Sequence, residues 1–310
     1  MSRVAVALDI GGTKTAAATV TADGAVLTRA KRPTPAAGGA RAVLDTAVEL
    51  ACEVGADHEV VGVGVGSAGV VDPDTGLVLS ATDALPGWAG TDLRGHLATE
   101  LGVPVAVVND VHAHALGEYR RGAARGGSTV LLVAVGTGVG GALLCEGRLH
   151  SGARAAAGHV GHVPVAAAAG RRCPCGAEGH VESVASGPAL VAEYTERGGV
   201  AVTRLEEVVA LVGRDPVARS VLVDGATALG SALAGLANVV APDVIVIGGG
   251  VAGAGVHWWS ALTEEIEQGL VPALRGLSVV PAALGADAAL LGAAHLVWRE
   301  AEETMWEEHR

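Results

Sequence analysis

Two segments in different halves of this chain follow one plan: an apolar strand, a glycine- and threonine-containing turn, and a second apolar strand. The first spans residues 4–20 with the turn Gly11-Gly12-Thr13, and the second spans 131–145 with the turn Gly136-Thr137-Gly138. Each predicts a β-hairpin whose turn lets backbone N–H groups approach a ligand, because glycine carries no Cβ. The repetition favours two similar domains facing each other across a cleft; a chance match of two glycine-rich hairpins is the alternative.

Apolar residues run continuously through the predicted strands instead of alternating with polar ones. Such runs occupy residues 4–8, 60–65, 105–108, 130–135 and 244–247. A continuous run is typical of a strand that helices cover on both faces. Helical stretches at 41–54, 92–101, 111–121 and 188–197 separate the runs. The sequence therefore predicts an α/β fold.

Length and charge limit the function classes. A chain of 310 residues is long enough for about two domains. Its 21 basic and 33 acidic residues give a net charge of −12. A negative chain lacks the basic surface that duplex nucleic acid or an anionic membrane requires, so we expect neither as a partner.

Two uncharged runs, 126–145 and 244–263, are long enough to cross a membrane. Both contain several glycines, so we interpret them as buried strands interrupted by loops. The N-terminal apolar run is short and meets Asp9 at once, which does not fit a signal peptide. We expect a cytoplasmic protein.

The two glycine turns are candidate phosphate-binding sites. Successive N–H groups in such a turn form an anion-binding concavity, to which Thr13 and Thr137 add hydroxyl groups and Lys14 adds a charge. Neither turn has the spacing of a P-loop or of a dinucleotide-binding loop. Together they favour a clamp on a polyphosphate, and tight hairpins without a ligand are the alternative. Asp9 would then lie near nucleotide-bound Mg²⁺, through water, or else serve only as a hydrogen-bonded strand end.

A third glycine cluster, Gly248-Gly249-Gly250, follows the apolar run 244–247. Bare backbone at this point can accommodate a flat ring or a ribose. The cluster predicts a surface for adenosine.

Asn109 and Asp110 stand where an apolar strand ends and a helix begins. Asp110 can be the N-cap of that helix. The other interpretation is functional, because strand carboxyl ends in α/β sheets border ligand sites. A carboxylate at Asp110 can accept a proton from a substrate hydroxyl, while the Asn109 amide orients another hydroxyl.

Four residues, His162, Cys173, Cys175 and His180, offer the nitrogen and sulfur ligands that a structural zinc site needs. A pair of reduced thiols in a loop is the alternative. His159 and Glu182 are not needed as ligands, so both are free to face a substrate.

These motifs together resemble the ROK family, specifically its bacterial sugar kinases of the glucokinase type. The resemblance covers nearly the whole chain. It is carried by the two glycine turns, the Cys/His cluster and the segments Leu85-Pro-Gly-Trp88, Asn109-Asp110, Gly117-Glu-Tyr119 and Ala185-Ser-Gly-Pro-Ala189.

The resemblance implies a two-domain actin-like ATPase fold of the ribonuclease H-like type, with a cleft between the domains. We expect a smaller N-terminal domain at 1–110, completed by a helix at 287–310, and a larger domain with the zinc loop at 111–286. It implies a sugar kinase that uses ATP, Mg²⁺ and structural Zn²⁺, assembled as a homodimer or homotetramer.

The resemblance also assigns roles to single residues. Asp110 matches the general base toward the sugar 6-hydroxyl, and Asn109, Glu182 and His162 match sugar-binding residues. His162 also matches a zinc ligand, and Gly69 is placed, more loosely, at the turn that contacts the sugar.

Two positions depart from the family pattern. His180 replaces the third cysteine of the zinc loop, and we expect the site to persist with two cysteines and two histidines. His159 replaces a glutamate that accepts hydrogen bonds from sugar hydroxyls, whereas neutral imidazole donates one bond and accepts one. We therefore expect an amino sugar or otherwise modified hexose. A plain glucokinase, or a sugar-binding or regulatory protein without turnover, is the alternative.

Overall fold

The structure is a computed structural model that describes residues 2–82 and 84–308, with side chains described up to residue 301. The described residues form two compact units. The first unit comprises those within Met1–Arg125, Leu149–Ala157 and Ala283–Arg310, and the second comprises Gly126–Arg148 and Gly158–Ala282.

The first unit is built on a five-stranded sheet and four helices. Its strands are β1 (Arg3–Ile10), β2 (Lys14–Val20), β3 (Val26–Pro33), β4 (Glu59–Ser67) and β7 (Val105–Asn109), and a short pair, β5 (Val70–Val71) and β6 (Val78–Ser80), stands apart. Its helices are α1 (Gly39–Gly55), α2 (Leu93–Leu101), α3 (Asp110–Arg121) and α9 (Ala288–Glu308).

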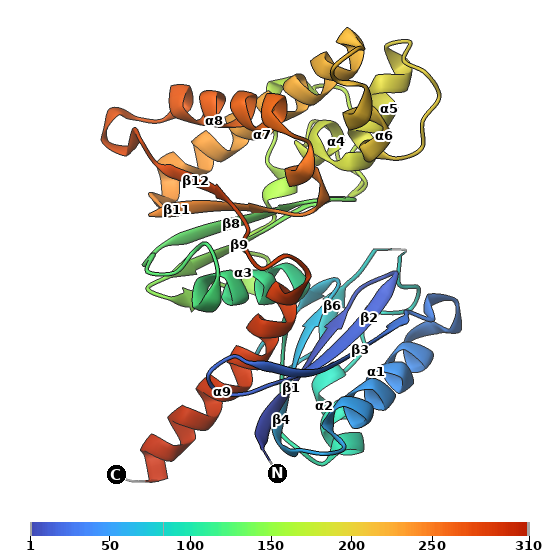
Figure 1. The fold of residues 1–310 in the computed structure, drawn as a ribbon, viewed down its shortest axis with the longest axis vertical. Coiled ribbons are helices and arrows are strands. Elements are labelled where there is room, and N and C mark those ends of the chain that lie inside the picture. Colours follow the sequence, from blue (N-terminus) through green and yellow to red (C-terminus); the bar gives the residue numbers. More distant parts are fainter. Residues whose placement is uncertain (1, 83, 309–310) are drawn as a thin grey trace. The chain divides into compact units, whose positions relative to one another are not determined.

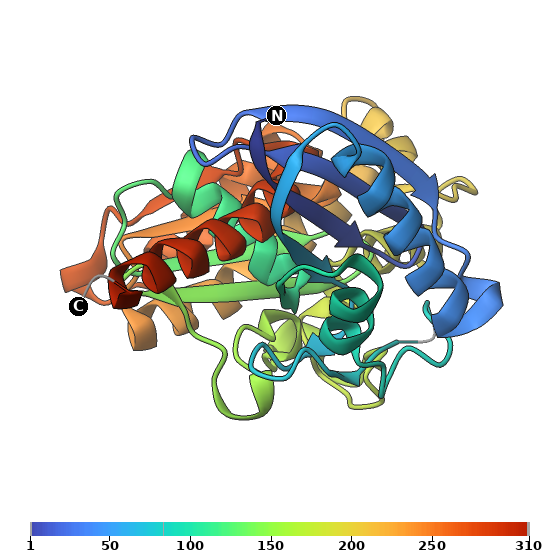
Figure 2. The ribbon, with the colours of Figure 1, turned by 90° about the horizontal axis from the view of Figure 1, so that it is seen from below.

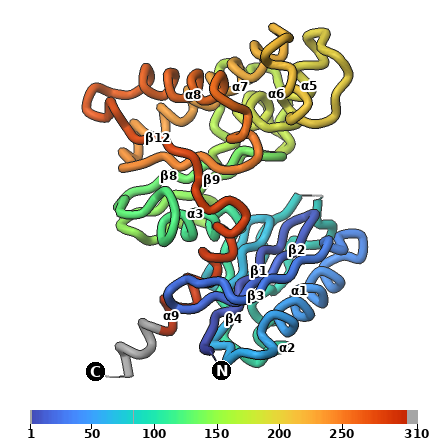
Figure 3. The backbone as a smooth tube through the Cα atoms, in the orientation of Figure 1, coloured from blue at the N-terminus to red at the C-terminus, as the bar shows by residue number. Residues whose placement is uncertain are grey.

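The strand order of this sheet is β3-β2-β1-β4-β7. Strands β1, β4 and β7 are parallel, whereas β2 and β3 are antiparallel additions that Figure 3 traces in blue. Helices α1 and α2 pack on one face of the sheet, and α3 and α9 pack on the other (Figures 1 and 2). The carboxyl ends of β1, β4 and β7 therefore lie at one edge, where candidate site residues follow.

Burial explains the continuous apolar pattern of the central strand. Residues Val4 to Leu8 of β1 are at most 1% exposed, because helices cover both faces of the sheet. The edge strand β3 alternates between more and less exposed residues. Polar side chains also fix the helix ends: Asp92 caps α2 by accepting from the N–H of Gly95 at 2.8 Å.

The second unit has its own five-stranded sheet. Its strands are β8 (Val130–Val135), β9 (Val139–Cys145), β10 (Arg148–Leu149, of which Arg148 belongs to this unit), β11 (Val244–Gly248) and β12 (Ser278–Pro281), in the order β10-β9-β8-β11-β12. Its helices are α4 (Glu182–Ala185), α5 (Gly187–Glu196), α6 (Leu205–Leu211), α7 (Pro216–Val240) and α8 (Val256–Gly269). Helices α7 and α8 pack side by side above this sheet in Figure 1.

Helix α7 is the one helix of the described residues that is long and apolar enough to cross a membrane. Within its most apolar window, 61% of the residues are buried inside the structure. Ala226, Leu229 and Leu233 of α7 belong to the hydrophobic core of the second unit. The apolar character of α7 is therefore explained by packing.

The predicted strands and helices are all present, so the α/β prediction is confirmed. The interpretation of the two uncharged runs is confirmed for 126–145, which contains all of β8 and β9. It is wrong for the end of 244–263, because residues 256–263 belong to α8.

The unit boundary also differs from the expected one after residue 110. Helix α3 stays in the first unit because it packs against α9 and β4. Helix α9 belongs to the same unit, and residues 309–310 of the expected terminal helix lie outside the described residues.

Candidate active site

The carboxyl ends of β1 and β7 bring Asp9 and Asn109 to one edge of the first sheet. Strand β4 lies between them, with Gly66 paired to Asp9 and Ser67 paired to Asn109. Parallel strands end at the same edge, which is where α/β sheets place ligands. Asp9, Asn109 and Asp110 therefore form one polar cluster.

Asp110 is the first residue of α3, and the N-cap is Asn109. The Asn109 Oδ1 accepts from the N–H groups of Val111 at 2.9 Å and His112 at 3.2 Å. The interpretation of Asp110 as the N-cap is therefore wrong. The Asp110 carboxylate is left with one oxygen, Oδ2, that takes part in no hydrogen bond formed by the described residues.

Burial and, as a smaller contribution, the nearby negative charge of Asp9 raise the pKa of Asp110 to about 6. Hydrogen bonds from the Val111 N–H and the Asn109 amide act in the opposite direction. Burial also raises the pKa of Asp9, against the attraction of Lys14. A carboxylate whose pKa lies close to neutral pH is ionised at pH 7 and still basic enough to take a proton.

The Asn109 amide is engaged within the chain. Its Nδ2 lies 2.8 Å from both the Gly69 carbonyl oxygen and the Asp110 Oδ1. Gly69 has a φ of +95°, and a Cβ there would come within 2.5 Å of the Ser80 carbonyl oxygen, so only glycine fits. In this state Asn109 positions Asp110 and the turn at Gly69.

Two buried side chains with no predicted role, Trp88 and Ser67, support that turn. The Trp88 Nε1 donates to the Ser67 Oγ at 3.1 Å and to the Ala68 carbonyl oxygen at 3.2 Å. Trp88 is 1% exposed and Ser67 is fully buried. In the sequence Trp88 appears only as part of a family motif. Its hydrogen bond to Ser67 could not be predicted, because the two residues are 21 positions apart.

The first glycine turn leaves two backbone donors open. The Gly11 N–H donates to the Lys14 carbonyl oxygen at 3.0 Å, and the Thr34 hydroxyl donates to the Gly11 carbonyl oxygen at 2.7 Å. Among the described residues, nothing accepts from the N–H of Gly12 or Thr13. Neither Gly11 nor Gly12 has a positive φ, so what they provide is the absence of a Cβ.

The second turn repeats this arrangement in the second unit. The Gly136 N–H donates to the Gly138 carbonyl oxygen at 2.8 Å. No acceptor within the described part of the chain bonds the N–H of Thr137 or Gly138. Each turn thus presents two consecutive N–H groups, which is the geometry of an anion-binding concavity.

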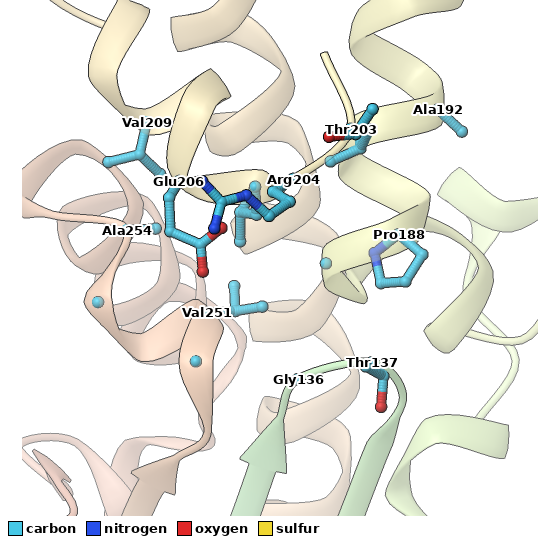
Figure 4. Close-up of a pocket in the computed structure, with 15 residues that line it drawn as sticks. Gly136, Thr137, Pro188, Ala192, Thr203, Arg204, Glu206, Val209, Val251 and Ala254 are labelled. Carbon is cyan, nitrogen blue, oxygen red and sulfur yellow. The ribbon is translucent and has the colours of Figure 1, made fainter. Parts of the chain in front are cut away.

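A cavity of about 670 Å³ in the second unit begins at this turn. Figure 4 shows Gly136 and Thr137 at one end and the side chains of Arg204 and Glu206 near the other. Gly187 and Pro188 of α5, Val209 of α6, and Gly250, Val251 and Ala254 complete much of its lining. The volume suits a nucleotide-sized ligand.

One residue of the third glycine cluster, Gly250, lines the cavity. Gly248 ends β11, paired with Ala134. Gly249 has a φ of +84°, and a Cβ there would lie 2.2 Å from the Val135 carbonyl oxygen. Gly248 and Gly249 therefore serve the packing of β11 on β8. The contribution of α6 to the cavity had no local signal in the sequence.

His162, Cys173, Cys175 and His180 converge, with ligand atoms within 4.8 Å of one another. Cys173 Sγ lies 3.6 Å from His162 Nδ1, and Cys175 Sγ lies 3.2 Å from His180 Nδ1. Tetrahedral zinc with usual bond lengths separates such atoms by about 3.5 Å. Burial raises the pKa of the Cys173 thiol to about 11, so its thiolate needs a cation beside it. The four residues fit a zinc ion.

Glu182 joins this cluster to the second glycine turn. Its Oε2 accepts from the Val139 N–H at 2.7 Å, and its Oε1 lies 3.9 Å from Cys173 Sγ. A Cβ on Gly138 would come within 2.7 Å of Oε2. The carboxylate was expected to be free for substrate, but here it supports the phosphate turn.

The two candidate sugar-facing histidines lie side by side. The rings of His159 and His162 are stacked with centroids 5.8 Å apart, and His162 lies 5.2 Å from His180. Burial lowers the pKa of His162, against the attraction of Glu182. His162 is therefore neutral at pH 7, as a metal ligand must be.

Comparison with known proteins identifies relatives along the whole chain. The model of the ROK family matches residues 5–300. Glucokinase from Halalkalibacterium halodurans is 33% identical, over 97% of this chain and 96% of its own length. N-acetylmannosamine kinase from Pasteurella multocida is 31% identical, over 93% of this chain and 94% of its own length.

A solved structure shares the fold. The ROK family glucokinase from Streptomyces griseus, in complex with glucose and AMPPNP, superposes with a TM-score of 0.80 at 32% identity. The match covers 94% of this chain and 98% of that one. The predicted actin-like ATPase fold is thereby confirmed.

Proposed function

Because this chain belongs to the ROK family and is a sugar kinase of that family, we propose that it transfers the γ-phosphoryl group of ATP to the 6-hydroxyl of a glucose-like hexose. One observation carries the proposal most directly. The Asp110 carboxylate, with its pKa raised to about 6, lies at the strand ends beside Asp9 and is oriented by Asn109.

Asp110 is the proposed general base. Phosphoryl transfer passes through a loose transition state, so catalysis depends mainly on positioning and on charge stabilisation. Asp110 accepts the proton of the sugar hydroxyl as the bond to phosphorus forms and the bond to the departing ADP oxygen breaks. The bond from Asn109 holds Oδ1 and leaves Oδ2 for that proton.

The glycine turns are the proposed phosphate contacts. Gly11, Gly12, Thr13 and Lys14 in the first unit and Gly136, Thr137 and Gly138 in the second present open N–H groups, hydroxyls and a cation. The cavity beyond Thr137 takes the nucleoside, with Gly250 in its lining. Asp9 would hold Mg²⁺, which would supply charge neutralisation at the phosphates.

The zinc ligands are His162, Cys173, Cys175 and His180, and the ion would stabilise the loop that presents His162 and Glu182. His159, His162, Gly69, Asn109 and Glu182 are the proposed sugar-site residues. We place the enzyme in the cytoplasm, where ATP is available, as a homodimer or homotetramer.

The sugar is proposed to be an amino sugar or otherwise modified hexose. His159 supports this, because an imidazole offers one donor and one acceptor where two carboxylate oxygens would only accept. Plain glucose is the second candidate, supported by the similarity to the glucokinase of Halalkalibacterium halodurans. The similarity to N-acetylmannosamine kinase supports the first.

An ATP-consumption assay across hexoses and amino sugars tests the proposal, with Asp110→Asn as the inactive reference. Sugar-dependent ADP formation is expected, with kcat/KM for an amino sugar above that for glucose. The His159→Glu variant should shift this ratio toward glucose at least about tenfold. If no acceptor causes ADP to form, the protein is a sugar-binding protein without turnover. If glucose is the best substrate, the protein is a plain glucokinase.

A further inference from the structure

A small basic cavity lies in the first unit, away from every residue assigned above to ATP, sugar or zinc. It is formed where the β2–β3 turn, the last turn of α3 and the middle of α9 meet, and its volume is about 30 Å³. Its charged or titratable lining residues are Arg120, Arg121, His295 and Arg299. No carboxylate lines it among the residues with described side chains.

Arg120 and Arg121 are the last two residues of α3, and both line this cavity. Among the described side chains neither forms a salt bridge, whereas Arg29 pairs with Asp287 and Arg32 pairs with Glu53. The exposed Asp23 lies near Arg121: its pKa is lowered mainly by the hydrogen bond from Thr21 and, as a lesser cause, by the positive charge of Arg121. Among the described residues, two guanidinium groups without a bonded carboxylate therefore line the same cavity.

The turn between β2 and β3 leaves room for one of these guanidinium groups beside the cavity. Gly24 has a φ of +83°, and a Cβ there would lie 2.5 Å from the Arg121 Nε. A side chain at this position would be strained by the positive φ and would meet the mobile end of the Arg121 side chain. The Trp298 Nε1 donates to the Val20 carbonyl oxygen at 3.2 Å and fixes α9 to the same strand end.

The pKa of His295 reflects the positive charges that surround this cavity. Burial, and then the positive charges of Arg120, Arg299 and Arg121, lower its pKa to about 4. At neutral pH its imidazole is uncharged, and it contributes an N–H donor or an acceptor according to its tautomer.

We propose that this cavity binds a tetrahedral oxyanion of the phosphate class. Guanidinium groups match the oxygen geometry of phosphate with paired N–H donors. A single water molecule needs roughly 10–15 Å³ of cavity volume. At about 30 Å³ the cavity therefore accepts a small polyatomic anion and excludes a nucleotide. The anion can be free inorganic phosphate or the phosphoryl group of a hexose 6-phosphate, whose sugar would remain in solvent.

The contrasting explanation is that Arg120 and Arg121 only offset the negative end of the α3 dipole. Nuclear magnetic resonance of the His295 ring at pH 7.5 separates the two. Inorganic phosphate is titrated into the wild type, into the double variant R120Q/R121Q, and into the control R41Q, whose arginine pairs with Asp45 on α1. Potassium chloride at equal ionic strength is the blank.

The site predicts a saturable shift of the His295 resonance in wild type and R41Q, with affinity at least about tenfold weaker in R120Q/R121Q. Both arginines are exposed, so the variants should fold, and their unfolding midpoints check this. A shift that does not saturate, or an equal affinity in the double variant, overturns the proposal. A second titration with hexose 6-phosphate identifies which phosphate the cavity binds. Tighter binding than inorganic phosphate would make the hexose 6-phosphate product the ligand, and weaker binding would make free inorganic phosphate the ligand.

Discussion

The Nδ2 of Asn109 lies 2.8 Å from the Oδ1 of Asp110, so the residue that caps α3 also orients the carboxylate that follows it. One side chain thereby serves helix stability and the proposed base together. Its amide oxygen accepts from the helix N-terminus, and its amide nitrogen donates to Asp110 and to the Gly69 carbonyl.

The two roles of Asn109 can be separated by substitution. Asn109→Ser keeps a good N-cap but loses the donor to Asp110, so the free energy of unfolding should change by less than about 0.5 kcal/mol. The pKa of Asp110 should rise, because the Asn109 bond now lowers it, and the acid limb of the kcat/KM profile should move to higher pH. Asn109→Ala should in addition lose about 1 kcal/mol of stability. Urea unfolding and pH–rate profiles measure both effects, and an unmoved acid limb in Asn109→Ser would refute the positioning role.

Asp110 should reduce the stability of the fold that it serves. Its folded-state pKa of about 6 lies above the ordinary 3.8, so the native state loses stability as pH rises from about 4 through 6. Asp110→Asn removes that loss. We expect its free energy of unfolding at pH 7.5 to exceed that of the wild type by about 1–2 kcal/mol after allowance for solvent screening.

Urea denaturation at two pH values checks this expectation. The difference between Asp110→Asn and wild type should shrink below pH 4, where the wild-type carboxyl is protonated in both states. A variant less stable than wild type at pH 7.5 would show that the carboxylate is not strained by burial.

Glu182 is expected to affect nucleotide binding through the Val139 N–H. Glu182→Ala removes a charge-assisted bond, so the affinity for a non-hydrolysable ATP analogue, measured by calorimetry without sugar, should fall about tenfold. Glu178→Ala, an exposed carboxylate in the same loop, is the matched control, and zinc content should be equal in both variants. If only sugar affinity falls, Glu182 acts on the sugar alone.

The metal cluster makes a prediction about ligand chemistry. Wild type and His180→Cys should each retain about one zinc ion per chain, because imidazole and thiolate both suit tetrahedral zinc. His180→Ala should lose the ion and unfold at lower urea concentration. Elemental analysis of the purified proteins measures this, and full zinc retention by His180→Ala would remove that residue from the ligand set.

Local patterns in the sequence were enough to predict the main strands and helices and the two glycine turns. The apolar run 105–108 became β7, and both glycine turns became hairpins, because burial on two faces and the absence of a Cβ are local properties. The sequence offered Asp110 as one possible cap of α3, whereas the cap is Asn109; both residue types cap well, and only the backbone dihedrals decide between them.

Contacts that are distant in sequence were not predictable. Glu182 reaches Val139 across 43 residues, and Arg204 joins Thr137 in one cavity only through the packing of α6. Such pairs carry no periodic pattern, so the sequence showed the residues as candidates without showing which partners would engage them. The same limit hid the unit boundary, because the place of α3 is set by its packing on α9.

The most direct test of the central claim is the turnover of Asp110→Asn with the sugar that the wild type phosphorylates, at saturating MgATP. Asp110 as general base predicts that kcat falls about 10²–10⁴-fold while sugar affinity, measured by calorimetry, stays within a few-fold of wild type. A kcat within tenfold of the wild-type value would contradict the account, because the sugar hydroxyl would then lose its proton without help from Asp110.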